Sequence, residues 1–171
     1  FNLCQVLIEA GDEVIIPAPY WVTYPEQVKF SDGVPVFIET DDSNDFKITA
    51  EQLKAAITPK TKILLLNSPS NPTGSVYSKE ELLAIGEVLK GTDIIIFSDE
   101  MYEKIIYDGK KFVATAEVSA DMYNRTVTIN GLSKAVAMTG WRFGYLATPD
   151  LKLAKALTKL QGQVTSNVNS M

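Results

Sequence analysis

The stretch KILLLNSPSNPTGSVYSKEELLAIGEVLKGTDIIIFSDE, residues 62–100, decides the fold of this chain. It opens and closes with short apolar runs, at residues 62–68 and 92–100, in which apolar side chains follow one another without alternation. Strands that are buried on both faces have this composition. Between these runs, residues 78–91 carry apolar side chains at helical spacing and begin with a capping box at Ser78. The stretch therefore predicts two neighbouring parallel strands joined by a helix.

The same alternation of strands and helices continues on both sides of this stretch. It predicts an α/β fold with a mainly parallel sheet that helices cover on both faces. Because no repeat and no linker interrupts the pattern, residues 1–171 are expected to form one domain. The expected strands lie within residues 11–21, 34–39, 62–68, 92–100, 126–134 and 143–150, and the expected helices within residues 1–10, 24–30, 49–57, 78–91 and 151–160.

The composition argues against several classes of function. The chain is 46% hydrophobic and 22% charged, which is typical of an ordinary globular protein. A net charge of −5 argues against a surface for nucleic acid or for anionic membranes. With no histidine and one cysteine, the usual zinc-ligand sets cannot form, so no metal is expected.

Location and completeness are expectations from the same sequence. The single cysteine cannot form an internal disulfide, the apolar runs are too short to span a membrane, and the first residues lack the features of a signal peptide. We therefore expect a cytoplasmic protein. The lysine-bearing helix at residues 151–160 is expected to present a solvated face rather than to lie on a membrane. Because the chain starts part-way along an apolar helix, we also expect it to be a piece of a longer protein.

In open α/β sheets, ligands bind at the carboxyl ends of the strands, and unusual residues collect there. Asp99 lies two residues after the apolar run Ile94–Phe97, and Tyr102 lies three residues further on. A carboxylate at that depth needs a partner, because burying a lone charge is costly. Asp99 is therefore a candidate binding residue, and the alternative interpretation is that it caps the next turn.

Two further strand ends carry candidate residues. Asn71 stands between two prolines, and a rigid loop of this kind fixes an amide against a ligand, although a stiff turn is the alternative interpretation. Trp21 lies with Tyr20 and Tyr24 after the first expected strand. These rings are placed to stack on a planar ligand, and filling of the core is the alternative.

The fourth segment is NGLSKAVAMTGWRFGYL, residues 130–146, in which Lys134 and Arg142 stand among small and apolar side chains. An apolar pocket and a nearby like charge both favour the neutral form of a lysine amine, which makes the amine a nucleophile toward carbonyls. We therefore expect Lys134 to lie in such a pocket near Arg142. The alternative interpretation is a pair of surface cations.

Together and in this order, the four segments resemble the pyridoxal-phosphate (PLP) enzymes of fold type I, and among them the class I aminotransferases similar to aspartate aminotransferase. The segment GLSKAVAMTGWRFG is similar to the lysine motif of that family, and PYWVTYPE, NSPSNPTG and SDEMYE match its other motifs. The resemblance covers residues 1 to about 160. It implies a three-layer α/β/α sandwich with a mainly parallel mixed sheet, whose last strand, GYLAT, is antiparallel.

The resemblance also implies roles for individual residues. Lys134 corresponds to the lysine that forms a Schiff base with PLP and moves the proton between Cα and C4′. Asp99 corresponds to the partner of the pyridine nitrogen. Tyr102 and Asn71 correspond to the residues that hydrogen-bond to the ring hydroxyl oxygen, and Trp21 to the residue that stacks on the ring.

The resemblance also implies a phosphate site, and this chain departs from the family pattern at two positions. Arg142, with Ser133, corresponds to the phosphate-binding residues, but many relatives carry serine or threonine where this chain has Gly131. The histidine that supports the aspartate in some relatives is absent, and Tyr24 is expected in its neighbourhood. The peptide bond before Pro72 is expected to be cis, as in the family.

The implied function is an aminotransferase that moves an amino group between an L-amino acid, of aspartate or aromatic type, and a 2-oxo acid. The resemblance further implies a homodimer. It also implies an N-terminal arm, a glycine-rich phosphate turn and a small domain that are not in this sequence, with the helix from about residue 150 leading towards the small domain. We therefore expect the isolated chain to be inactive.

Two other functions remain open at this stage. The same residues serve every PLP reaction, so another fold type I enzyme, such as a β-lyase or a decarboxylase, fits equally well. A non-catalytic PLP-binding sensor domain is the alternative from a different class. The sequence does not identify the amino-acid substrate.

Overall fold

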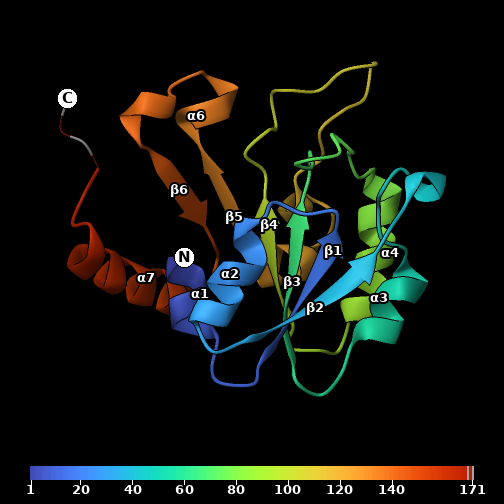
Figure 1. The fold of residues 1–171 in the computed structure, drawn as a ribbon, viewed down its shortest axis with the longest axis horizontal. Helices are drawn as coiled ribbons and strands as arrows, with labels where there is room; N and C mark the ends of the chain where they lie inside the picture. The colour runs from blue at the N-terminus through green and yellow to red at the C-terminus, as the bar shows by residue number, and fades with distance from the viewer. Residues whose placement is uncertain (169, 171) are drawn as a thin grey trace.

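The computed structural model describes residues 1–168 and 170, and it contains a six-stranded sheet in the order β2-β1-β3-β4-β5-β6. The first five strands in this order are parallel to one another. The last strand, β6, runs antiparallel to β5 (Figure 1). The mainly parallel sheet and its antiparallel last strand are therefore confirmed. The strands are β1 (Glu13–Ala18), β2 (Val34–Glu39), β3 (Thr61–Asn67), β4 (Ile95–Asp99), β5 (Thr126–Gly131) and β6 (Gly144–Ala147).

Helices cover both faces of this sheet, which confirms the three-layer arrangement. The first and last helices, α1 and α7, pack against each other on one side, together with α2, while α3 and α4 lie on the other side (Figure 1). The helices are α1 (Asn2–Leu7), α2 (Thr23–Phe30), α3 (Ala50–Ala56), α4 (Lys79–Leu89), α5 (Ala120–Arg125), α6 (Leu132–Ala135) and α7 (Leu151–Val164), with 3-10 turns η1 (Asp42–Asn44), η2 (Thr115–Glu117) and η3 (Thr139–Trp141).

The two core clusters explain why β3 reads as an unbroken apolar run. Successive side chains of a strand point to opposite faces of its sheet. Leu64 and Leu66 accordingly pack with α3 and α4, whereas Ile63 and Leu65 pack with α1, α2 and α7. All four side chains are buried. A strand placed between two helical layers has no solvent face on which a polar residue would be tolerated.

The capping box predicted at Ser78 is formed at the start of α4, and α3 begins with another. Ser78 Oγ accepts a hydrogen bond from the Glu81 backbone N–H, and the Glu81 carboxylate accepts one from the Ser78 N–H. Thr49 and Gln52 make the same reciprocal pair at the start of α3. Each box gives partners to backbone N–H groups that the first helical turn leaves free.

Two expected boundaries are wrong, and one helix was not predicted. The first helix ends at Leu7 rather than near Ala10. The strand expected within residues 126–134 ends at Gly131 and is followed at once by α6. Helix α5 was not predicted, because only Met122 of its six residues is buried and no apolar period marks it. Short elements of this kind are fixed by tertiary contacts rather than by local pattern.

No helix among the described residues is long and apolar enough to cross a membrane.

Gly131 is held where β5 and β6 approach each other closely. A Cβ added at Gly131 would lie 2.8 Å from the carbonyl oxygen of Phe143 and 3.1 Å from the end of the Met101 side chain. The first of these atoms belongs to the backbone, so it cannot move away without disturbing the strand pair. This close approach accounts for a glycine at this position.

We expect Gly131→Ala to destabilise the whole protein by about 1–3 kcal/mol, the usual effect of overpacking. Urea unfolding followed by circular dichroism measures this change. Gly140→Ala is the matched control, because a Cβ at Gly140 meets no atom within 4 Å. Equal stability of the two variants would show that the strands separate easily enough to admit a side chain.

Candidate functional site

The candidate residues gather at one end of the sheet. Parallel strands end at the same edge, so the loops after β3, β4 and β5 lie together, as Figure 1 shows at the top of the molecule. Asn67 and Asp99, the last residues of β3 and β4, are direct neighbours in the sheet. The four segments that are far apart in the sequence therefore meet at this edge.

Asp99 lies at the centre of this edge and accepts hydrogen bonds at both carboxylate oxygens. The Tyr24 hydroxyl donates to Oδ2 at 2.7 Å, and the Met101 backbone N–H donates to Oδ1 at 3.1 Å. Tyr24 is buried at 5% exposure and comes from α2. The expectation that Tyr24 would lie beside this aspartate is confirmed.

Burial dominates the electrostatics of this pair. It raises the pKa of the Asp99 carboxyl, although the hydrogen bonds from Tyr24 and Met101 act in the opposite direction. The pKa of the Tyr24 hydroxyl is raised strongly, first by burial and then by the neighbouring Asp99 charge. Among the described residues, no lysine or arginine forms a salt bridge with Asp99. Asp99 is thus a largely buried carboxyl without a cationic partner in the described part of the chain.

Asn71 lies on a loop that is tied to the end of β3. Its backbone N–H donates to Asn67 Oδ1 at 2.7 Å, and the peptide bond between Asn71 and Pro72 is cis, as predicted. Tyr24, Asn67 and Asn71 line one pocket together. Asn67 was not among the predicted site residues, because an asparagine at a strand end is indistinguishable in sequence from an ordinary turn residue.

The aromatic residues after β1 divide into different roles. Trp21 packs edge-on against Tyr24, with 5.4 Å between the ring centroids, and keeps 42% of its surface exposed. Tyr20 stacks on Phe37 of β2 at 4.9 Å and is a partly buried side chain at the edge of the core, while Phe37 keeps 40% of its surface exposed. Trp21 is therefore the aromatic residue of this group that is both anchored and open to solvent.

Lys134 meets Tyr102 at the same edge. The Lys134 Nζ atom lies 5.8 Å from the centroid of the Tyr102 ring. Tyr102 follows Asp99 by three residues, and Asp99 pairs with Ile129 of β5, the strand that leads directly into α6 and Lys134. The carboxyl and the amine therefore lie at the same edge of the sheet.

The apolar pocket expected around Lys134 is not formed by the described residues. Lys134 is exposed, and Val136 beside it keeps 54% of its surface. The reason is local: β5 ends at Gly131, and the four residues of α6 that follow include no buried side chain. The apolar residues around the lysine in sequence are therefore apolar surface in this chain.

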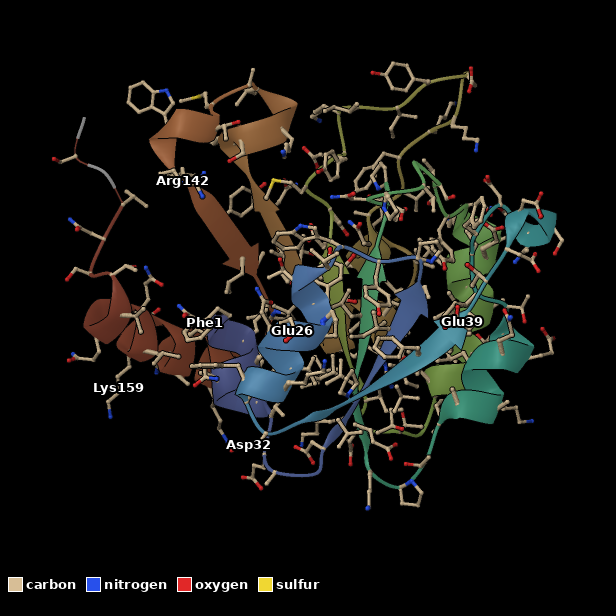
Figure 2. The ribbon with its side chains drawn as sticks, viewed as in Figure 1. Phe1, Glu26, Asp32, Glu39, Arg142 and Lys159 are labelled. Atoms are coloured by element: carbon tan, nitrogen blue, oxygen red, sulfur yellow. The ribbon has the colours of Figure 1, made fainter. Side chains whose placement is uncertain are left out.

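Arg142 and Ser133 are joined through one threonine. The Thr139 hydroxyl donates to the Ser133 carbonyl oxygen at 2.9 Å, and Arg142 Nη1 donates to the Thr139 carbonyl oxygen at 2.9 Å. Arg142 is exposed, and Figure 2 shows it just before β6, at the end of the sheet that carries α6. Lys159 points outward from α7, as expected for a solvated face (Figure 2).

The residues present supply binding groups that suit an aromatic, phosphorylated ligand. Asp99 offers a buried carboxyl to a ring N–H, Trp21 an exposed ring face, and Arg142 an exposed guanidinium to an anion. Among the described residues, no group of three or more cysteine and carboxylate side chains is arranged to hold a metal ion.

Comparison with known proteins gives consistent relatives. The profile of the family "Aminotransferase class I and II" matches residues 1–171. The chain is 56% identical over 171 residues to an aspartate aminotransferase of Geobacillus stearothermophilus, covering 100% of this chain and 43% of that protein. It is 53% identical over 172 residues to an aspartate/prephenate aminotransferase of Nitrosomonas europaea, again covering 100% of this chain and 43% of that protein.

Solved structures agree with this assignment. The aspartate aminotransferase of Rhizobium meliloti superposes with a TM-score of 0.93 at 48% identity, covering 96% of this chain and 41% of that one. An aspartate aminotransferase of Thermus thermophilus with maleate gives a TM-score of 0.91 at 43% identity, covering 98% of this chain and 43% of that one. The chain thus spans under half the length of the relatives that it matches. On the profile match over its full length, the chain belongs to the class I and II aminotransferase family.

Proposed function

We propose that the whole protein is a PLP-dependent aminotransferase that transfers an amino group between an L-amino acid of aspartate or aromatic type and a 2-oxo acid. The observation that carries the proposal is Asp99, a largely buried carboxyl with no cationic partner among the described residues, at the same edge of the sheet as the amine of Lys134. A buried carboxyl of this kind is stabilised by a ligand that brings its own positive charge. The names of the relatives, aspartate and aspartate/prephenate aminotransferases, support the choice of reaction.

The site residues fit PLP in their chemistry. When bound, PLP supplies an aldehyde that reacts with amines and a ring that withdraws electrons from the carbon bearing the amine. Asp99 would bind the ring nitrogen and keep it protonated, and Trp21 would stack on the ring. Tyr102 and Asn71 would hydrogen-bond to the ring hydroxyl oxygen. Each of these residues is at the edge of the sheet described above.

The remaining two roles concern the phosphate and the proton. Arg142, with Ser133, binds the phosphate, and Thr139 holds these two residues together. Lys134 would hold the aldehyde through its amine and would move the proton at the substrate Cα. Because Lys134 is exposed in this chain, the rest of the protein and the bound cofactor must supply the shielding that favours its neutral form.

The wider organisation is part of the same proposal. Residues 1–171 form the major part of the cofactor-binding large domain, and α7 leads towards a small domain that completes the substrate site. The whole protein is a homodimer in the cytoplasm. The coverage of the relatives, 43% of their length, supports a larger parent protein.

The test is product analysis with the purified whole protein and added PLP. With L-aspartate or an aromatic L-amino acid as donor and 2-oxoglutarate as acceptor, we expect glutamate to form in equal amount to the new 2-oxo acid. Parallel lines in double-reciprocal plots would show the ping-pong order. Pyruvate with free ammonia, or carbon dioxide without glutamate, would instead indicate a lyase or a decarboxylase, and cofactor binding without any product would indicate a sensor domain.

A further inference from the structure

The Asn67 side chain connects two of the proposed cofactor-binding residues. Its Nδ2 group donates to the carbonyl oxygen of Asp99 at 3.0 Å and to the carbonyl oxygen of Pro69 at 3.2 Å. Its Oδ1 atom accepts the backbone N–H of Asn71 at 2.7 Å. One amide group therefore contacts both the end of β4 and the loop after β3.

These contacts fix the peptide planes from which the functional side chains project. The carbonyl oxygen of Asp99 accepts a second hydrogen bond, from the Ser68 backbone N–H at 3.1 Å. These two hydrogen bonds fix the orientation of the peptide group that follows Asp99. They thereby fix the direction in which the Asp99 side chain leaves the strand. The Asn71 backbone is held in the same way by Asn67 Oδ1.

The arrangement leaves the functional groups themselves available. Asn67 bonds to backbone atoms of Asp99 and Asn71, not to the carboxyl of one or the amide of the other. Within the described part of the chain, the Asn71 side-chain amide has no hydrogen-bond partner. Asparagine suits this task because its planar amide carries two donors and an acceptor without charge.

We propose that Asn67 is a positioning residue that sets the spacing between Asp99 and Asn71, and so between the groups that hold the ring nitrogen and the ring hydroxyl of PLP. The inference rests on the proposed function. A residue that merely closed the turn would bond within its own loop, whereas Asn67 also reaches across to the neighbouring strand.

Two variants of the whole protein separate the two ends of this amide. Asn67→Leu keeps the number of side-chain heavy atoms and their branching, and it removes every side-chain hydrogen bond. Asn67→Asp keeps the acceptor for the Asn71 N–H and removes both donors to carbonyl oxygens. Asn124→Asp, at an exposed asparagine of α5, is the matched control for the same chemical change.

We expect Asn67→Leu to speed hydrogen exchange at the Asn71 amide by about tenfold or more in the cofactor-free protein, because its acceptor is lost. In Asn67→Asp this amide should stay protected. Both variants should bind PLP about tenfold more weakly, measured by tryptophan fluorescence. Because an added negative charge also repels the anionic phosphate and ring oxygen of PLP, the loss is assigned to positioning only when the neutral Asn67→Leu variant shows it as well.

The absorbance of the bound cofactor gives a readout that loss of stability does not move. In Asn67→Leu we expect the pH midpoint of its absorbance change to rise by about one pH unit, because a displaced Asn71 no longer stabilises the negative ring oxygen. PLP affinities of both Asn67 variants within twofold of the Asn124→Asp control would overturn the inference. If Asn67→Leu fails to fold, the neutral and smaller Asn67→Ala variant takes its place in the same measurements. If the parent protein itself neither binds PLP nor transfers amino groups, the proposed function fails instead.

Discussion

Replacing Lys134 with alanine in the whole protein should lower the rate of amino transfer by about 10⁴-fold or more, because both covalent binding of the cofactor and proton transfer at the reacting carbon would be lost. The amine of Lys134 lies 5.8 Å from the Tyr102 ring, at the edge where Asp99 ends β4. Steady-state assays with saturating PLP measure the loss.

Lys104→Ala is the matched control for this change. Lys104 is an exposed lysine two residues after Tyr102, and its salt bridge with Glu103 at 3.5 Å is on the surface. Surface pairs of this kind contribute little to stability. We therefore expect the control to retain its activity within about twofold. Comparable losses in the two variants would mean that the region tolerates no change, and would remove the special role of Lys134.

The second large effect is expected at Asp99. Asp99→Asn should lower amino transfer by about a thousandfold, since a carboxylate near a protonated ring contributes about 4 kcal/mol at 4 Å and an effective dielectric of 20, and each 1.4 kcal/mol corresponds to about tenfold. The asparagine keeps the size of the side chain. The loss should therefore appear in kcat and not in the folded fraction.

Although Asp99→Asn should lower activity, it should raise the stability of the cofactor-free protein. Burial raises the pKa of Asp99 above its ordinary value of 3.8. A carboxyl with a raised folded pKa stabilises the fold below its ordinary pKa and loses that contribution as the pH rises through its folded pKa. In the cofactor-free protein, Asp99→Asn should therefore gain stability relative to the parent as the pH rises above 3.8. Urea unfolding at several pH values measures the difference.

Asp121→Asn provides a control of opposite sign. Its hydrogen bonds with Arg125 lower the pKa of the Asp121 carboxyl. That contribution is present above the ordinary pKa and is lost as the pH falls through the folded pKa, so this variant should lose stability relative to the parent at neutral pH. If Asp99→Asn behaved like Asp121→Asn, Asp99 would be a structural acid rather than a buried group held for a cationic ligand.

The strands and the principal helices were predictable from sequence because their signals are local. A few neighbouring residues are enough to predict each element, as in the apolar run of β3 and the capping boxes at Ser78 and Thr49. Helix α5 escaped prediction because one buried methionine in six residues leaves no period. Its position follows from packing against the sheet, which a local pattern does not contain.

The sequence predicted which residues belong to the candidate site, but not all of their contacts and exposures. Tyr24 was expected near Asp99, and its hydroxyl does donate to that carboxyl. The role of Asn67 was not visible, since it depends on β3 and β4 being neighbours in register. The exposure of Lys134 was also missed, because apolar neighbours in sequence do not form a pocket unless another element covers them.

The central claim is that Lys134 is the amine that binds the cofactor while Asp99 holds the ring nitrogen. The most direct measurement is borohydride reduction of the PLP-loaded whole protein, followed by protease digestion and mass spectrometry of the peptides. We expect a single pyridoxyl adduct, on Lys134. An adduct on another lysine, with Lys134 unmodified, would contradict the assignment of the site.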